Sequence, residues 1–253
     1  MAKRERIDKL LVERGLAETR AKAQALVLAG TVVAGETRID KPGQQVNVEL
    51  PIRLKGEILK YVSRGGVKLE GALDHFQVDP KGLSAMDVGA STGGFTDCLL
   101  QRGAERVLAL DVGYGQLHPK IRGDSRVTVR ERVNARALTR EDVPFDVDLI
   151  VVDVSFISLK LVLPSAFSFL KAGGALVALV KPQFEVGREE VGKGGVVRDE
   201  AARLRAIEGI NEFVRGQGLT VVGWTDAKIA GPAGNLEALL YARKPPVPST
   251  GPG

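Results

Sequence analysis

Hydrophobic and polar positions follow two periods along the chain. Short apolar runs have the length and composition of buried strands, and apolar residues at helical spacing lie between most of them. The expected strands of the larger part of the chain are residues 83–88, 106–112, 127–131, 146–153, 175–180, 219–224 and 236–241. Seven strands alternating with helices predict an α/β fold with a Rossmann-like sheet.

The first 60 residues carry a smaller pattern of the same kind. Apolar positions at helical spacing over residues 6–12 predict one helix, and Thr19 is suited to cap a second over residues 20–29. Residues 31–36 have the composition of a strand followed by a turn, and residues 46–50 alternate between apolar and polar side chains as a strand does. This segment therefore predicts a compact α/β unit of its own.

These patterns predict a chain of two domains. We expect a small N-terminal domain over residues 1–60, with the connection near residues 56–62, and a large domain over residues 63–243. Residues 244–253 are so rich in Pro and Gly that we expect a disordered tail.

The abrupt change from strand to helix in the stretch Asp-Val-Gly-Ala-Ser-Thr-Gly-Gly-Phe-Thr, residues 87–96, is typical of a ligand site. Glycines allow positive φ and a close approach of ligand to backbone, and the helix N-terminus offers unpaired N–H groups. Asp111 ends the next strand, where Rossmann-like folds hold ribose hydroxyls. We therefore predict a nucleoside-cofactor site. The spacing is neither the dinucleotide fingerprint nor a P-loop.

Composition excludes several classes of site. The 253 residues, 44% of them hydrophobic, can bury one large core or a medium core with a small satellite domain. Cys98 is the only cysteine, so no internal disulfide can form and a reducing compartment fits. With His75 and His118 as the only histidines, no zinc cluster is expected. No secretory signal or apolar run of about 18 residues is present, so we expect a cytoplasmic protein without a membrane segment.

The positive charge is concentrated at the N-terminus. Residues 1–60 hold 12 Lys and Arg against 8 Asp and Glu, whereas residues 61–253 hold 24 against 23. A basic patch favours nucleic acid through counterion release, but surface lysines and arginines also serve solubility. Charge alone leaves both interpretations open. The basic residues on the expected outer faces are Lys3, Arg4, Arg6, Arg20, Lys22 and Arg38.

The stretch RIDKLLVERGLAETRAKAQALVLAGTVVAGE resembles the two helices and hairpin of the S4-like RNA-binding domain. This resemblance covers about 50 residues and implies binding of structured RNA through basic side chains on the helix surface. The RNA contacts it implies are Lys3, Arg4, Arg6, Arg20 and Lys22, to which we add Arg64 at the start of the large domain.

Four charged residues of mixed sign stand near the ends of predicted elements in the large domain. Asp153 and Lys181 follow two buried strands, Glu237 lies in the last hairpin, and Lys68 lies near the start of a helix. Each has an ordinary explanation, such as a snorkelling lysine or a strand-edge charge. Lys68 nevertheless opposes the helix-dipole preference. Together the four predict a functional cluster over one crevice.

Six motifs, VSRGGVKLEGAL, DVGASTGGFTDCLL, LDVGYGQL, VDVSFISL, LVKPQFEVG and GPAGNLE, resemble the TlyA (hemolysin A) family of RNA 2′-O-methyltransferases, whose catalytic domain is FtsJ-like. With the S4-like segment, the resemblance covers nearly the whole chain. It implies a class I methyltransferase sheet, S-adenosylmethionine as cofactor and methylation of ribose, with cytidine in ribosomal RNA as the expected target. Ribosomal RNA or a ribosomal subunit is then the expected partner, with no metal.

The resemblance also assigns roles to individual residues. The catalytic tetrad it implies is Lys68, Asp153, Lys181 and Glu237. The cofactor residues that the resemblance and the glycine stretch suggest together are Gly89, Ser91, Thr92, Gly93, Gly94, Phe95, Asp111, Asn134 and Asp153.

Other interpretations stay open at this level. A noncatalytic RNA-binding or ribosome assembly factor, a membrane-active hemolysin and a small-molecule methyltransferase are the rivals. The absence of an amphipathic or spanning segment argues against the hemolysin, and the basic N-terminal domain argues against a small-molecule substrate. Residues 186–198 form either a substrate lid or a plain surface loop.

Overall fold

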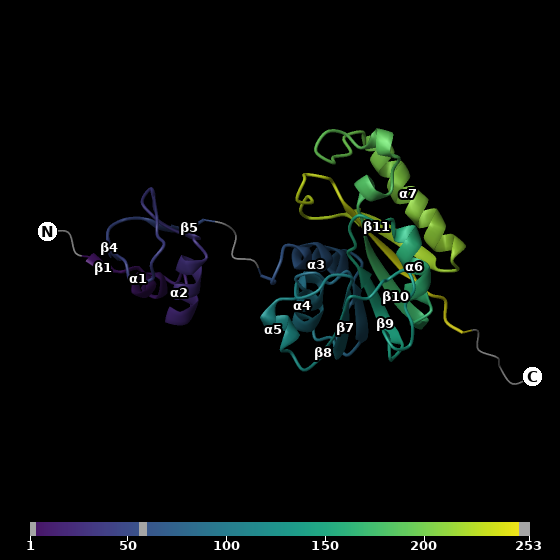
Figure 1. The fold of residues 1–253 in the computed structure, drawn as a ribbon, viewed down its shortest axis with the longest axis horizontal. Coiled ribbons are helices and arrows are strands. Elements are labelled where there is room, and N and C mark those ends of the chain that lie inside the picture. Colours follow the sequence, from purple (N-terminus) through teal and green to yellow (C-terminus); the bar gives the residue numbers. More distant parts are fainter. Residues whose placement is uncertain (1–3, 56–59, 248–253) are drawn as a thin grey trace, which may run out of the picture. The chain divides into compact units, whose positions relative to one another are not determined.

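The computed structural model describes residues 4–55 and 60–247 of the chain (Figure 1). The chain divides into two compact units, Met1–Leu59 and Lys60–Gly253, and each unit has its own hydrophobic core.

The N-terminal unit packs two helices against short strands. Thr19 caps the second helix by accepting a hydrogen bond from the Lys22 amide at 3.2 Å, so both predicted helices and this cap are confirmed. The strands β1, β3 and β5 were not predicted, because two or three residues carry too little periodicity by themselves. The elements are β1 (Arg4–Arg6), α1 (Ile7–Glu13), α2 (Arg20–Leu28), β2 (Val32–Ala34), β3 (Thr37–Arg38), β4 (Gln45–Asn47) and β5 (Ile52–Leu54). β1 pairs with β4, and β2 lies between β3 and β5.

A buried carboxylate ties α1 to α2 in this unit. Asp8 is 0% exposed and accepts hydrogen bonds from Arg6, Arg20 and Gln24, each at 2.9–3.0 Å. The hydrogen bonds from the Arg6 guanidinium hold the pKa of Asp8 well below its usual range. Two of the predicted RNA-binding arginines therefore also fasten the fold.

Residues 60–247 form one seven-stranded sheet, which confirms the predicted Rossmann-like α/β fold. The strands in order across the sheet are β11 (Thr220–Asp226), β12 (Ala238–Arg243), β10 (Leu170–Val180), β9 (Val147–Val152), β6 (Ser84–Val88), β7 (Arg106–Asp111) and β8 (Val127–Glu131). The five strands from β10 to β8 are parallel, whereas β12 is antiparallel to both of its neighbours. The carboxyl ends of the parallel strands therefore meet at one edge.

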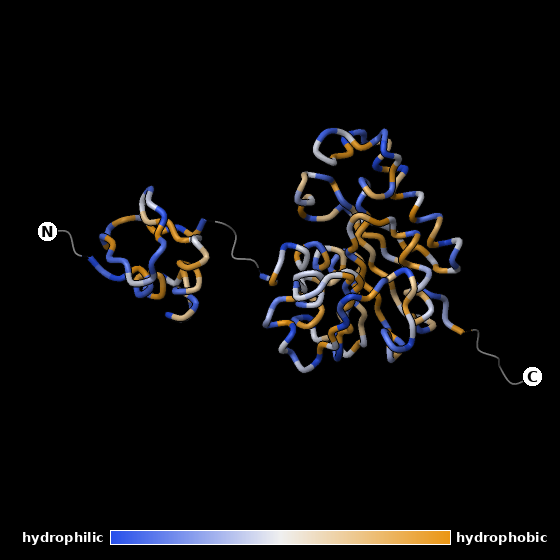
Figure 2. Tube along the Cα trace, viewed as in Figure 1, coloured by the Kyte–Doolittle hydropathy of each residue, from blue (hydrophilic) through white to orange (hydrophobic). Residues whose placement is uncertain are grey.

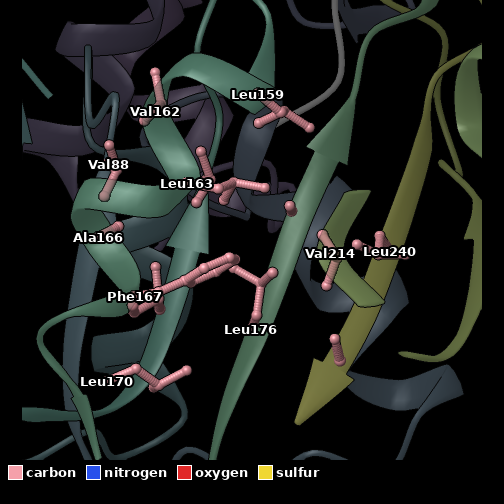
Figure 3. Packing of buried hydrophobic residues seen from close by; sticks show 14 of the residues in the cluster. Val88, Leu159, Val162, Leu163, Ala166, Phe167, Leu170, Leu176, Val214 and Leu240 are labelled. Carbon is pink, nitrogen blue, oxygen red and sulfur yellow. The ribbon is translucent and has the colours of Figure 1, made fainter. Parts of the chain in front are cut away.

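Helices cover both faces of this sheet (Figure 1). The helices α3 (Gly65–His75), α4 (Gly94–Gln101) and α5 (Pro119–Arg122) share one hydrophobic cluster with the sheet. The helices α6 (Leu159–Phe167) and α7 (Glu200–Gly216) share the other. Figure 3 shows Val162, Leu163 and Phe167 of α6 packing toward Val88 and Leu176 of the sheet. Hydrophobic residues gather on the strands, and hydrophilic residues on the outer loops (Figure 2).

Helix α6 differs from the prediction at both of its ends. Helix α6 begins at Leu159 rather than Leu161, because the Ser158 hydroxyl accepts a hydrogen bond from the Lys160 amide at 3.2 Å and caps the helix there. The helix also ends three residues early, and Leu170 instead pairs with Val147 as the first residue of β10.

The predicted disordered tail begins too early. Lys244, its first residue, donates from Nζ to the carbonyl oxygens of Phe167 at 3.2 Å and Leu170 at 2.6 Å. Lys244 therefore belongs to the folded unit, because its amino group donates to the carbonyls of the last residue of α6 and the first residue of β10. Residues 248–253 of the tail, and residues 56–59 of the predicted connection, lie outside the described residues.

We expect Asp8→Ala to lower the free energy of unfolding of the N-terminal unit by about 1–3 kcal/mol at neutral pH, because three donors lose their buried acceptor. The lowered pKa of Asp8 means that this difference shrinks as the pH falls below about 4. Hydrogen exchange of the backbone amides in residues 4–55, measured on the full chain, reports the change. The control is Glu36→Ala, since Glu36 forms only an exposed pair with Arg53 at 3.5 Å. Equal protection of these amides from exchange in the two variants would contradict the stabilising role of Asp8.

Candidate active site

A tight bend joins β6 to α4 at the carboxyl edge of the sheet. Its backbone enters the left-handed region at Gly89, Ser91 and Gly93, with φ of 86°, 47° and 96°. A Cβ on Gly89 would lie 2.4 Å from the Asp153 carbonyl oxygen, so only glycine fits where β6 and β9 end side by side. The bend therefore depends on glycine for both its conformation and its packing.

Asp111 is fixed at the end of β7 by two backbone amides. Its Oδ2 accepts a hydrogen bond from the Ser91 amide at 2.7 Å, and its Oδ1 accepts one from the Gly113 amide at 2.7 Å. The carboxylate is thus held directly against the bend.

A cavity of about 450 Å³ opens beside the bend and Asp111. This volume lies within the range of small-molecule cofactor sites. Five of the predicted cofactor residues line it, namely Gly89, Ser91, Asp111, Asn134 and Asp153. The sequence interpretation missed other lining residues in the segments after β8 and β9, namely Val133, Arg136, Val154, Phe156 and Ile157.

The other predicted cofactor residues do not line this cavity. Phe95 is only 3% exposed and packs in the hydrophobic cluster beneath α3 and α4. A Cβ on Gly94 would lie 2.1 Å from the Ser63 hydroxyl, and one on Gly93 would lie 2.9 Å from Leu117. These glycines let neighbouring segments pack behind the bend, and Thr92 accepts a hydrogen bond from the His118 amide at 3.1 Å through its carbonyl.

The predicted tetrad forms two ion pairs in the described part of the chain. Lys181 Nζ lies 2.5 Å from Asp153 Oδ1 and donates to the Ser155 hydroxyl at 2.7 Å. Asp153 and Ser155 line the cavity, so this pair lies at its wall. The second pair joins Lys68 of α3 to Glu237, and the two residues are 6% and 2% exposed. The contacts thus join Lys68 to Glu237 and Lys181 to Asp153.

The turn before β12 is shaped around Glu237. A Cβ on Gly231 would lie 2.4 Å from Glu237 Oε1, so glycine is needed where the turn crosses this carboxylate. Glu237 Oε1 is buried and has no hydrogen-bond partner among the described residues. A buried carboxylate oxygen in this state can accept a hydrogen bond from a ligand hydroxyl.

Asn235 ties the segment 186–198 to the same turn. Its side chain is buried, accepts a hydrogen bond from the Val197 amide at 2.9 Å and donates one to the Gly195 carbonyl at 2.8 Å. Gly192 and Val196 form an antiparallel bridge that closes a small hairpin. The choice between lid and surface loop remains open, but the C-terminal part of this segment is anchored two residues from Glu237. In the sequence, the motif GPAGNLE already places Asn235 two residues before Glu237.

A second buried carboxyl lies beneath the bend. Asp87 is 0% exposed, and Thr96 donates a hydrogen bond to its Oδ2 at 2.6 Å. Burial, with a smaller contribution from the nearby Asp153 carboxylate, raises the pKa of Asp87 to about 7. Sequence reasoning did not single out Asp87, although it begins the glycine stretch, because its burial depends on the packing of α4.

The predicted RNA-binding residues are spread over both units. Arg4, Arg20, Lys22 and Arg64 are exposed and Arg6 is half-buried, whereas Lys3 lies outside the described residues. Arg4 donates to the Gln45 carbonyl at 2.9 Å, Lys22 pairs with Glu18, and Arg64 donates to the Ala230 carbonyl at 3.4 Å.

The described residues contain neither a metal-binding cluster nor a membrane-spanning helix. They contain no cluster of three or more His, Cys, Asp or Glu side chains able to hold a metal ion. None of the described helices has the length and hydropathy needed to cross a membrane.

Residues 61–244 match the model of the FtsJ-like methyltransferase family, and residues 5–52 match that of the S4 domain. The chain is 45% identical over 244 residues to TlyA of Mycobacterium tuberculosis (strain H37Rv), named 16S/23S rRNA (cytidine-2′-O)-methyltransferase, covering 96% of this chain and 91% of TlyA. It is 49% identical over 245 residues to YqxC of Bacillus subtilis, described as a candidate rRNA methyltransferase. This match covers 96% of this chain and 87% of YqxC. A solved Streptococcus thermophilus structure, described as a candidate hemolysin, aligns with a TM-score of 0.74 and 43% identity, covering 99% of this chain and 94% of that one.

The raised pKa of Asp87 predicts a specific dependence of stability on pH. Between about pH 4 and pH 7 the folded chain keeps a proton that the unfolded chain has lost, so the free energy of unfolding falls by up to about 4 kcal/mol and then levels off. In Asp87→Asn this contribution disappears. Denaturant titrations at several pH values measure it, with Asp40→Asn, an exposed partner of Arg38, as control. Parallel curves for the wild type and Asp87→Asn would show that Asp87 stays ionised.

Proposed function

The chain belongs to the FtsJ-like methyltransferase family, and from this premise we propose that it methylates the ribose 2′-hydroxyl of a cytidine in ribosomal RNA, with S-adenosylmethionine as the methyl donor. The observation that carries the proposal is the Lys181–Asp153 pair, which lies at the wall of a cavity suited to a nucleoside cofactor. The names of the relatives support ribosomal RNA as the substrate. We assign this activity to the cytoplasm, where ribosomal subunits are found.

The residues around the cavity fit S-adenosylmethionine. Asp111, already oriented by two amides, has further lone pairs that would accept the ribose hydroxyls of the cofactor. Gly89 and Ser91 would border its methionine part, and Asn134 its adenine. When bound, the cofactor supplies an electrophilic methyl group on a sulfonium. Asp153 borders both this site and Lys181.

Lys181 is the group that would act on the ribose hydroxyl. A 2′-hydroxyl is a weak nucleophile, so it needs a group that accepts or orients its proton. The Lys181 amino group is held by Asp153 on one side and Ser155 on another. As an ammonium with these two partners among the described residues, it would donate its third N–H to the hydroxyl oxygen and orient it. As a neutral amine it would accept the hydroxyl proton as the oxygen attacks the methyl group. In-line attack then depends mainly on positioning.

Lys68 and Glu237 would complete the site at the same end of β10, since Val180, just before Lys181, pairs with Ala238, just after Glu237. Their pairing keeps both charges in place despite burial. The buried Glu237 Oε1 would accept a hydrogen bond from the RNA ribose.

Phe156 offers a surface for the target base. It lines the cavity, is 91% exposed, and has a left-handed backbone with φ of 65°. An exposed aromatic ring beside a cofactor cavity is suited to stack an unpaired base, which is how proteins commonly read single-stranded RNA. The N-terminal unit would add affinity for folded RNA through its basic side chains.

We expect Lys181→Ala to lower the rate of RNA methylation by a factor of about 10²–10⁴, with little change in the affinity for S-adenosylmethionine. Transfer of a radioactive methyl group to ribosomal subunits measures the rate, and calorimetry measures the affinity. Lys171→Ala is the matched control, because Lys171 lies at the opposite end of β10 and pairs with Asp148 at 2.8 Å. Full methylation by Lys181→Ala would refute the role. A wild type that binds cofactor and RNA without transfer would favour an RNA-binding assembly factor.

We expect replacement of Arg4 and Lys22 by alanine to weaken RNA binding uniformly across RNA sequences. Each phosphate contact removed should reduce the slope of log affinity against log salt by about 1. Filter binding of a ribosomal RNA fragment at several salt concentrations measures the slope, with Lys171→Ala as control. An unchanged slope would show that these two side chains do not contact phosphate.

A further inference from the structure

Glu185 binds both groups that begin helix α6. Its Oε2 accepts a hydrogen bond from the Ser158 hydroxyl at 2.6 Å, and its Oε1 accepts one from the Leu159 amide at 2.8 Å. A carboxylate at this position satisfies an unpaired helical N–H and complements the helix dipole. Burial raises the pKa of the Glu185 carboxyl, and the two hydrogen bonds act against that shift.

Together with the Lys181–Asp153 ion pair, these contacts join two chain segments at two points and so form a closed ring. Glu185 lies four residues after Lys181, just beyond the 3₁₀ turn η1 (Pro182–Phe184) that follows β10. Ser158 lies five residues after Asp153, in the segment that follows β9. The two segments leave adjacent parallel strands. The Lys181–Asp153 ion pair joins them at the strand ends, and the Glu185–Ser158 hydrogen bond joins them farther out.

The segment inside this ring forms part of the cofactor cavity. Val154, Ser155, Phe156 and Ile157 all line the cavity. The left-handed φ of 65° at Phe156 is unfavourable for a bulky side chain, so the surrounding contacts must hold it. The ring of Phe156 also contacts the ring of Phe184, with centroids 5.3 Å apart, which adds a second link between the two segments.

We propose that Glu185 is a positioning residue, which holds the Val154–Ser158 segment in its cofactor-binding shape and keeps Lys181 aligned with Asp153. It acts through Ser158 and Leu159 and touches neither substrate nor cofactor. The effect on methyl transfer rests on the proposed function, whereas the effect on cofactor binding depends only on the cavity.

The test compares Glu185→Ala, Glu185→Gln and Ser158→Ala in the full chain at 25 °C. Calorimetry with S-adenosylmethionine gives the dissociation constant, and a single-turnover assay with ribosomal subunits gives the methyl-transfer rate. We expect Glu185→Ala to raise the dissociation constant about tenfold and to lower the rate about 100-fold, because small displacements of a catalytic geometry are costly. Glu185→Gln keeps one acceptor and should fall between Glu185→Ala and the wild type. Ser158→Ala keeps the Leu159 hydrogen bond and should also have the smaller effect.

The control is Glu189→Gln. Glu189 is exposed and lies four residues after Glu185, so its replacement should change neither the dissociation constant nor the methyl-transfer rate. A lower melting temperature for Glu185→Ala, with dissociation constant and rate both within twofold of the wild type, would overturn the proposal and leave Glu185 as a structural cap. If Glu185→Ala does not fold, Glu185→Gln and Ser158→Ala decide by the same criteria. If the wild type transfers no methyl group to RNA, the proposed function fails, and the cofactor affinities alone decide the role of Glu185.

Discussion

The buried ion pair between Lys68 and Glu237 links parts of the large unit that are far apart in the sequence. Moving both charges out of water costs several kcal/mol per ion, so the two can stay buried only while they face each other. Removing either partner would leave an unpaired buried charge, at a cost of about 3–5 kcal/mol. The pair therefore fixes helix α3 against the turn before β12. That turn must contain Gly231, because any side chain there would displace the carboxylate.

The position of α3 in turn constrains the bend between β6 and α4. The backbone at the start of α3 lies so close to α4 that a Cβ on Gly94 would come within 3.0 Å of the Gly66 amide nitrogen. Glycines in the bend thus serve two purposes. Gly89 faces the cavity and the end of β9, whereas Gly93 and Gly94 allow packing behind the bend. One short stretch both borders the cavity and allows α3 and α4 to pack closely on this face of the sheet.

The charged residues of the site occur in a graded series of environments. Asp87 is fully buried beneath the bend, Lys68 and Glu237 are buried as a pair, and Lys181 pairs with Asp153, which lines the cavity. Of these groups, Asp153 is the one that lines the cavity directly. The proposed Glu185 contact belongs to the same arrangement, since it connects the two segments that carry Lys181 and Asp153.

The sequence alone was sufficient for those features that depend on neighbouring residues. Local periodicity predicted the sheet strands, and Thr19 predicted its helix cap, because turn geometry and strand burial follow from nearby side chains. The glycine stretch and Asp111 pointed to the part of the sheet edge where the cavity lies. The family resemblance, rather than periodicity, singled out the four charged residues as a set. Only the tertiary structure decided that Lys68 meets Glu237 and that Asp8 holds Arg6 and Arg20. It also decided that Phe95 packs inward and that Glu185 reaches α6. These contacts join side chains from separate elements, and a partner in space depends on how the elements pack, which no local pattern encodes.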